Sequence, residues 1–153
     1  MVEIAPTSGL AARSLANAYR LSERYNDAIR WFETSIKLDP NLVGAHNGLG
    51  NCHRETGNFA AAIAVYQNAL ALDPSSAEIL YNLAIVHVDM GRFDDALAIA
   101  EQALKEQPDA AWAHLARGKA LAVKRVTKKH WQHTRKESNS IPPMSAASCC
   151  WLE

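Results

Sequence analysis

Residues 46–74 read HNGLGNCHRETGNFAAAIAVYQNALALDP. Two segments with apolar residues at helical spacing flank Gly57 and Asn58, and Pro74 ends the second segment. Glycine can adopt the left-handed conformation that ends a helix and reverses the chain. Proline disfavours helical geometry in the residue before it. The stretch therefore predicts two short antiparallel helices joined by a tight turn.

The same pattern recurs on both sides of this stretch with a period of 34 residues. Each repeated position keeps one physical character, and a period of this length indicates that one two-helix unit stacks on the next. The repeated positions are Leu15, Leu49 and Leu83, then Ala28, Ala62 and Ala96, then Tyr25, Phe59 and Phe93, then Ile36, Leu70 and Leu104, and finally Pro40, Pro74 and Pro108.

The repeated unit resembles the tetratricopeptide repeat, whose pattern is W-x2-L-G-x2-Y, then A-x3-F, then P. The flanking repeats depart from it mildly, because Ala12 or Leu80 replaces the Trp and Ala100 replaces the second-helix aromatic. The resemblance implies an all-α fold, an α-solenoid of helix-turn-helix tetratricopeptide repeats that winds as a right-handed superhelix. The middle repeat carries the pattern at His46, Leu49, Gly50, His53, Ala62, Tyr66 and Pro74.

The period also divides the chain into units. A fourth unit begins with an apolar helical stretch from Ala111 to Val123, but a basic segment follows where its second helix should stand. A repeat array needs a terminal element that shields its last apolar edge. The absence of a second helix in the fourth unit is also what we would expect of a fragment or variant of a longer repeat protein. We predict a lead-in over 1–8, repeats over 9–42, 43–76 and 77–110, a partial fourth repeat or capping helix with a basic end over 111–136, and a disordered tail over 137–153.

The composition argues against several classes of function. The chain has 16 Lys and Arg against 16 Asp and Glu, so no overall field attracts it to nucleic acid or to a membrane. Three cysteines form no disulfide framework, and the sequence has neither a secretory leader nor a long apolar run. We therefore expect a cytoplasmic protein with no nucleic-acid or membrane partner.

No catalytic motif stands out in the sequence. The glycines near Gly48 lie inside a helical repeat, so they form no phosphate-binding loop. Cys52 and His53 are adjacent on a helix and point to different faces. His130 and His133 with Cys149 and Cys150 offer metal-ligand types, but their spacing matches no compact zinc site. We expect no enzyme activity, no cofactor and no metal.

The resemblance implies that the first helix of each repeat lines a concave groove that binds extended peptides. Side-chain amides both donate and accept hydrogen bonds, so a ladder of Asn17, Asn51 and Asn82 is expected to hold a peptide backbone while arginines attract carboxylates. The alternative is that these residues are solvated and bind nothing. The predicted groove residues are Arg13, Asn17, Arg20, Asn47, Asn51, Arg54, Tyr81 and Asn82.

Some members of the family bind chaperone C-terminal carboxylates through Lys or Arg and Asn side chains in three repeats. Arg13 and Asn17 match the first unit of that clamp. Gly48 stands where an Asn is expected, and Glu78 and Asn82 stand where basic residues are needed. Because Glu78 would repel a carboxylate, we expect no co-chaperone role.

The first functional hypothesis is therefore a protein-interaction scaffold or adaptor with a protein or peptide partner. A second is the regulatory repeat segment of a larger enzyme, such as a glycosyl or sulfo transferase, whose catalytic part is absent. A third is attachment to nucleic acid or a membrane through the basic segment after Val123. Weak self-association through an uncovered end is a further expectation.

Overall fold

The computed structural model describes residues 7–138, apart from the side chains of residues 106, 133, 134 and 136–138. Within this range the chain is helical throughout and contains no strand. Corresponding helices begin 34 residues apart, so the sequence period is carried into the structure unchanged. The helices are α1 (Gly9–Leu21), α2 (Tyr25–Leu38), α3 (Val43–Glu55), α4 (Phe59–Leu72), α5 (Ala77–Asp89), α6 (Phe93–Glu106) and α7 (Ala111–Ser138).

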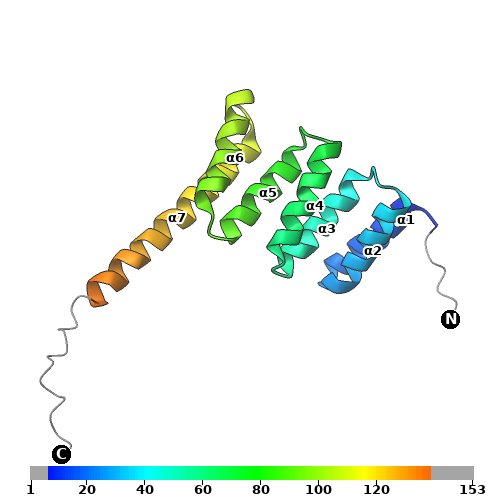
Figure 1. Cartoon of the computed structure of the whole chain (residues 1–153), viewed down its shortest axis with the longest axis horizontal. Coiled ribbons are helices and arrows are strands. Elements are labelled where there is room, and N and C mark those ends of the chain that lie inside the picture. The colour runs from blue at the N-terminus through cyan, green and yellow to red at the C-terminus, as the bar shows by residue number, and fades with distance from the viewer. Residues whose placement is uncertain (1–6, 139–153) are drawn as a thin grey trace, which may run out of the picture.

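Three helical hairpins stack in a row, and α7 follows the last of them (Figure 1). The first helices contact one another along the stack, α1 with α3, α3 with α5, and α5 with α7. In the part of the chain that the structure describes, no Cα atoms of α2, α4 and α6 come within 8 Å of one another. The first helices therefore form a closer inner layer, and the stack is concave on their side.

Helices α1, α3 and α5 end in the same backbone motif. The amide of Asn58 donates to the carbonyl of His53 at 2.8 Å, and the amide of Gly57 donates to that of Arg54 at 3.0 Å. This pair of bonds is the Schellman motif, which needs a left-handed residue. Gly57 and Gly91 have φ of 77° and 73°, as the sequence predicts, and Glu23 takes the same conformation at φ 58° without the freedom of glycine.

Aromatic rings of the second helices pack onto glycines of the first helices. The Phe32 ring lies against Gly48 in the next repeat, and the Tyr66 ring lies against Gly50 in its own repeat. A Cβ atom on Gly50 would lie 2.5 Å from the Tyr66 ring, so no larger residue fits there without movement. Phe32 and Tyr66 are fully buried, and they centre the first two parts of the core.

The last helix, α7, is continuous over 28 residues, so no second helix of a fourth unit follows it within the described residues. Its first half buries Ala113, Ala116 and Ala120 against α5 and α6. From residue 121 to 132 every side chain is exposed, and this half extends beyond the stack (Figure 1). Lys124 Nζ donates to Asp94 Oδ1 at 2.5 Å where α7 passes the start of α6. The first half of α7 therefore covers the end of the core.

Gly50 and Gly118 occupy the same repeat position in opposite surroundings. Gly118→Ala should stabilise the protein by about 0.8–1 kcal/mol, because the site is open and alanine favours a helix. Gly50→Ala should cost about 1–3 kcal/mol, because its methyl group overpacks the Tyr66 ring. Urea unfolding followed by circular dichroism measures both changes. Equal effects of the two substitutions would contradict the packing described above.

Glu23 offers a second stability test. A left-handed residue other than glycine costs about 1–2 kcal/mol, and the greater chain entropy of glycine offsets roughly half of that gain. Glu23→Gly should therefore raise the free energy of unfolding by about 0.5–1 kcal/mol. Gly57→Ala, at a position with no neighbouring atom within 4 Å, should lower it by about 1 kcal/mol. Thermal and urea denaturation should agree, and a destabilising Glu23→Gly would show that the φ value at this turn is not strained.

Candidate functional site, the inner groove

A line of three residue pairs crosses the inner layer. In α1 and α3 the fifth residue reaches the second residue of the next first helix, and in α5 the fifth residue packs against the same apolar cluster as the second residue of α7. Arg13 lies over Gly44, where an added Cβ would be 2.7 Å from a guanidinium nitrogen. Asn47 Nδ2 donates to Glu78 Oε1 at 2.8 Å. The third pair, Tyr81 and Trp112, packs in one apolar cluster. The chemistry of the groove therefore changes along the stack from cationic through amide and carboxylate to aromatic.

The cationic end contains a donor without an acceptor. The Nε atom of Arg13 is buried and has no hydrogen-bond partner. Asn17 lies one turn further along α1 and is half-buried, as is Arg20 after it. The guanidinium as a whole is only half-buried, and its terminal N–H groups can donate to a ligand oxygen. This end of the groove is suited to an acceptor group such as a carboxylate or a peptide carbonyl.

The middle of the groove is a chain of internal hydrogen bonds. Asn82 Nδ2 donates to Asn47 Oδ1 at 3.0 Å, and Asn47 in turn donates to Glu78. Asn47 and Asn82 are only 8% and 9% exposed. Their amide donors therefore link repeats two and three. Asn82 does not stand in the open ladder that the sequence suggested, because neighbouring helices bury it.

Two further predicted groove residues also have partners within the protein. Tyr66 Oη donates to Asn51 Oδ1 at 2.7 Å, so Asn51 helps to hold the buried tyrosine in place. Arg54 pairs with Glu55 at 2.5 Å and lies 3.7 Å from Asp89 on α5. The attraction of Arg54 for an incoming carboxylate is therefore reduced. Among the predicted residues, Arg13, Asn17 and Arg20 form the part of the groove with the most capacity for a ligand.

Sequence reasoning missed three residues of this line. Gly44, Glu78 and Trp112 hold the second position of successive first helices, and each meets a predicted groove residue. Their 34-residue spacing was a signal that could have found them. Glu78 had been considered only as a residue that opposes a carboxylate clamp.

Histidines at two equivalent positions join neighbouring repeats. His46 Nε2 is 2.9 Å from the Pro40 carbonyl, and His114 Nε2 is 2.8 Å from the Pro108 carbonyl. Because a carbonyl only accepts, each Nε2 carries the hydrogen. Burial lowers the pKa of His87, with Arg92 acting in the same direction and Asp95 opposing. His46 and His114 thus hold neighbouring repeats together. The described residues contain no cluster of three or more metal-ligating side chains.

Cys52 and its neighbours are buried in the core. Burial raises the pKa of the Cys52 thiol to about 11, although Arg20 acts against the shift. Burial also raises the pKa of Tyr66 and lowers that of His53. A protonated, buried thiol is a poor nucleophile. Cys52 therefore packs as a small apolar residue of the core.

Sequence models of one family match most of the repeat region. Two models, both described as tetratricopeptide repeat, match residues 13–77 and 53–118. The chain belongs to the tetratricopeptide repeat family. A comparison with curated proteins found no match. The tetratricopeptide fold predicted from the 34-residue period is confirmed by these models and by the helical structure.

Solved tetratricopeptide structures share the arrangement of the helices. The Arabidopsis OM64 TPR domain has a TM-score of 0.67 at 17% identity and covers 75% of this chain and 95% of its own. The first TPR of Spaghetti (RPAP3), bound to the HSP90 peptide SRMEEVD, has a TM-score of 0.68 at 17% identity and covers 82% and 99%. MamA has a TM-score of 0.66 at 26% identity and covers 86% and 72%.

Other expectations concern parts that the structure describes incompletely. The disordered tail was predicted over 137–153; residues 137 and 138 end α7, and residues 139–153, with Cys149 and Cys150, lie outside the described residues. Within residues 7–138, no helix has both the length and the apolar character that crossing a bilayer requires.

The reactivity of Cys52 tests the burial at the base of the groove. A pKa near 11 leaves far less thiolate at pH 8 than an ordinary cysteine has, so alkylation by iodoacetamide should be about 100-fold slower in the folded protein than in urea. Peptide-level mass spectrometry separates Cys52 from the two cysteines near the C-terminus. A rate within tenfold of the unfolded chain would show that this thiol is accessible in the native protein.

Proposed function

We propose that this chain is a protein-interaction scaffold that holds an extended peptide along its inner groove. The observation that carries the proposal is the half-buried Arg13 guanidinium, which lies over Gly44 and on the same helix as the half-buried Asn17, on the concave side of the stack. A peptide acceptor at this point would gain a charge-assisted hydrogen bond from the guanidinium. The proposed role is recognition, and it uses no catalytic residue.

The three residue pairs across the inner layer also suggest which peptide would fit. An acidic residue belongs at the Arg13 end, where a cation is present and Glu78 is distant in the stack. Beside Glu78 a second acidic residue would be repelled, so this part suits a neutral residue or one that donates hydrogen bonds. Tyr81 and Trp112 favour an apolar or aromatic residue beyond it. The expected ligand is an extended segment with acidic, polar and apolar residues in that order.

Two similar solved structures support peptide recognition in general. The RPAP3 domains were determined with the acidic peptides SRMEEVD and SGPTIEEVD. The domains are only 17% and 16% identical to this chain, so they share its fold and do not establish its ligand. Gly48 and Glu78 also lack the side chains that a carboxylate clamp needs in repeats two and three. We therefore propose a different protein segment as the partner.

A blocked-peptide library tests the groove directly. Octapeptides with one glutamate moved through an otherwise neutral sequence, with and without a C-terminal tyrosine, are measured by fluorescence anisotropy. The best peptide should lose about tenfold or more in affinity with Arg13→Ala, because a hydrogen bond to a charged group is worth about 1.5–3 kcal/mol. Asn17→Ala should weaken the same peptide.

Arg30 provides the matched control, because it is an exposed arginine on the outer helix α2. Arg30→Ala should leave the affinity unchanged and the circular dichroism spectrum intact. If Arg13→Ala and Arg30→Ala weaken the peptide equally, the attraction is a general charge effect and the groove proposal fails.

A further inference from the structure

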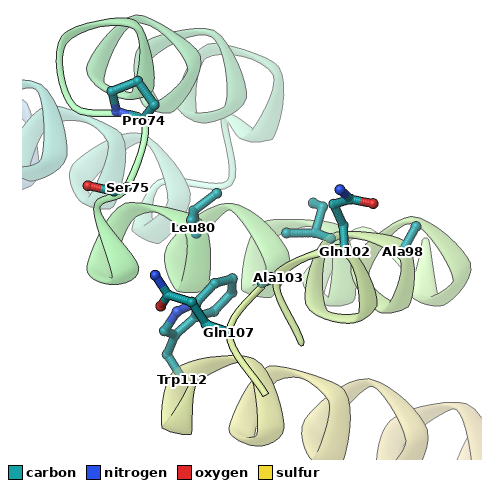
Figure 2. Close-up of a pocket in the computed structure, with 9 residues that line it drawn as sticks. Pro74, Ser75, Leu80, Ala98, Gln102, Ala103, Gln107 and Trp112 are labelled. Carbon is teal, nitrogen blue, oxygen red and sulfur yellow. The ribbon is translucent and has the colours of Figure 1, made fainter. Parts of the chain in front are cut away.

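A pocket of about 720 Å³ opens on α6 and shares Trp112 with the line of residue pairs in the inner layer. Figure 2 shows Trp112 and Gln107 facing Leu80 of α5, with Gln102 and Ala98 along α6. Its size falls within the usual range for ligand pockets of about 300–1,000 Å³. No predicted groove residue lines it. Its lining consists of Pro74, Ser75, Leu80, Ala98, Ile99, Gln102, Ala103, Gln107 and Trp112.

The repeats of this chain show what is missing from the pocket. At the fourth position of repeats two and four, His46 and His114 each donate a ring N–H to the proline carbonyl six residues earlier. Leu80 holds the same position in repeat three. Leucine has no donor, so the Pro74 carbonyl lacks the hydrogen bond that the Pro40 and Pro108 carbonyls receive. Leu80 and Pro74 both line the pocket.

We propose that this pocket binds a tryptophan side chain of a partner protein, with the indole N–H donated to the Pro74 carbonyl. The internal precedent is an aromatic ring that presents an N–H to this carbonyl in two other repeats. A flat apolar ring also suits walls made by Leu80, Ile99 and the Trp112 indole, since aromatic pairs add to the energy of buried area. The small side chains of Ala98 and Ala103 leave room for it.

An indole explains the polar part of the lining as well as the apolar part. Gln107 adds an amide group to the pocket lining, and the Ser75 hydroxyl, which donates to Asp73 Oδ1, can still accept a hydrogen bond; both can bind the backbone of the residues that flank the tryptophan. The pocket is also larger than one ring, which suits a short segment rather than an isolated side chain. Buried tryptophans of this kind commonly dominate the binding energy of a protein interface.

The tryptophan at position 151 of this chain is a less suitable occupant. From Trp112 to the end of α7 at Ser138, the helix spans about 40 Å at 1.5 Å per residue. Residues 139–151 can reach back about 45 Å only when almost fully extended. Holding thirteen residues in that state costs a large conformational entropy. A tryptophan from another protein avoids this cost.

The test uses N-acetyl-tryptophanamide as the probe and its 1-methylindole analogue, which lacks the N–H, as the matched control. The full-length chain is titrated by methyl NMR, following the side chain of Ile99. We expect saturable shifts at Ile99 with the first compound and at least fivefold weaker binding of the second. Equal affinity for the two compounds, or no shift at Ile99, would overturn the proposal.

Variants locate the site independently. Leu80→His introduces the donor that His46 and His114 supply in their repeats, so it should keep the fold and weaken probe binding at least tenfold. Ala98→Leu fills the pocket from an exposed position on α6 and should have the same effect, which keeps the test valid if the first variant is unstable. Ala64→Leu changes the equivalent exposed residue of α4 and should leave binding unchanged.

Two further outcomes are decisive. Trp151→Ala should leave probe affinity unchanged, and a clear gain in affinity would show that the chain fills its own pocket. Arg13→Ala should also leave the probe affinity unchanged, because Arg13 does not line this pocket. Failure of peptide binding in the groove and failure of tryptophan binding in the pocket can therefore be told apart.

Discussion

The stack depends on the contact between an aromatic ring of a second helix and a glycine of a first helix. Phe32 packs on Gly48 across two repeats, and Tyr66 packs on Gly50 within one. Buried aromatic side chains contribute a large apolar area, but only where the opposing helix has no side chain in the way. At the end of the array the constraint changes, because Ala100 and Ala116 replace ring and glycine and meet in one cluster. The combined volume of the two facing residues, more than the volume of either one, sets the distance between the first and second helices.

The same contact links the core to the groove. Tyr66, held against Gly50, donates its hydroxyl hydrogen to Asn51, the next residue of α3. Asn47, one turn earlier, bonds to both Asn82 and Glu78 of the next repeat. The packing of the core thus fixes the positions of the groups that form hydrogen bonds in the inner layer. A ligand on this surface meets a preorganised set of polar groups, which lowers the entropy that binding must overcome.

The paired helices of each unit and the turns at Gly57 and Gly91 could be predicted from the sequence, because a 34-residue period repeats the same local signals in each unit. Gly57 and Gly91 indicated the turns in which they lie. Glu23 adopts the same left-handed turn although no glycine stands there, and the same pair of backbone hydrogen bonds closes it. The roles of Asn47 and Asn82 could not be predicted. Their bond joins residues 35 apart and depends on how closely two first helices approach, which periodicity within one unit does not reveal. The pocket was missed for a related reason, since Leu80 matters only by comparison with His46 and His114.

The exposed half of α7 also sets the dimensions of the molecule. Beyond Leu121 the helix continues for about 25 Å at 1.5 Å per residue, and the side chains described there, those of residues 122–132 and 135, are all exposed. A compact domain of similar size has a radius of gyration of about 14 Å, and a curved row of hairpins with a projecting helix must exceed that value. The protein therefore diffuses and scatters as an elongated particle. Its basic helical end projects away from the stacked hairpins (Figure 1), so it and the concave surface can meet different neighbours at the same time.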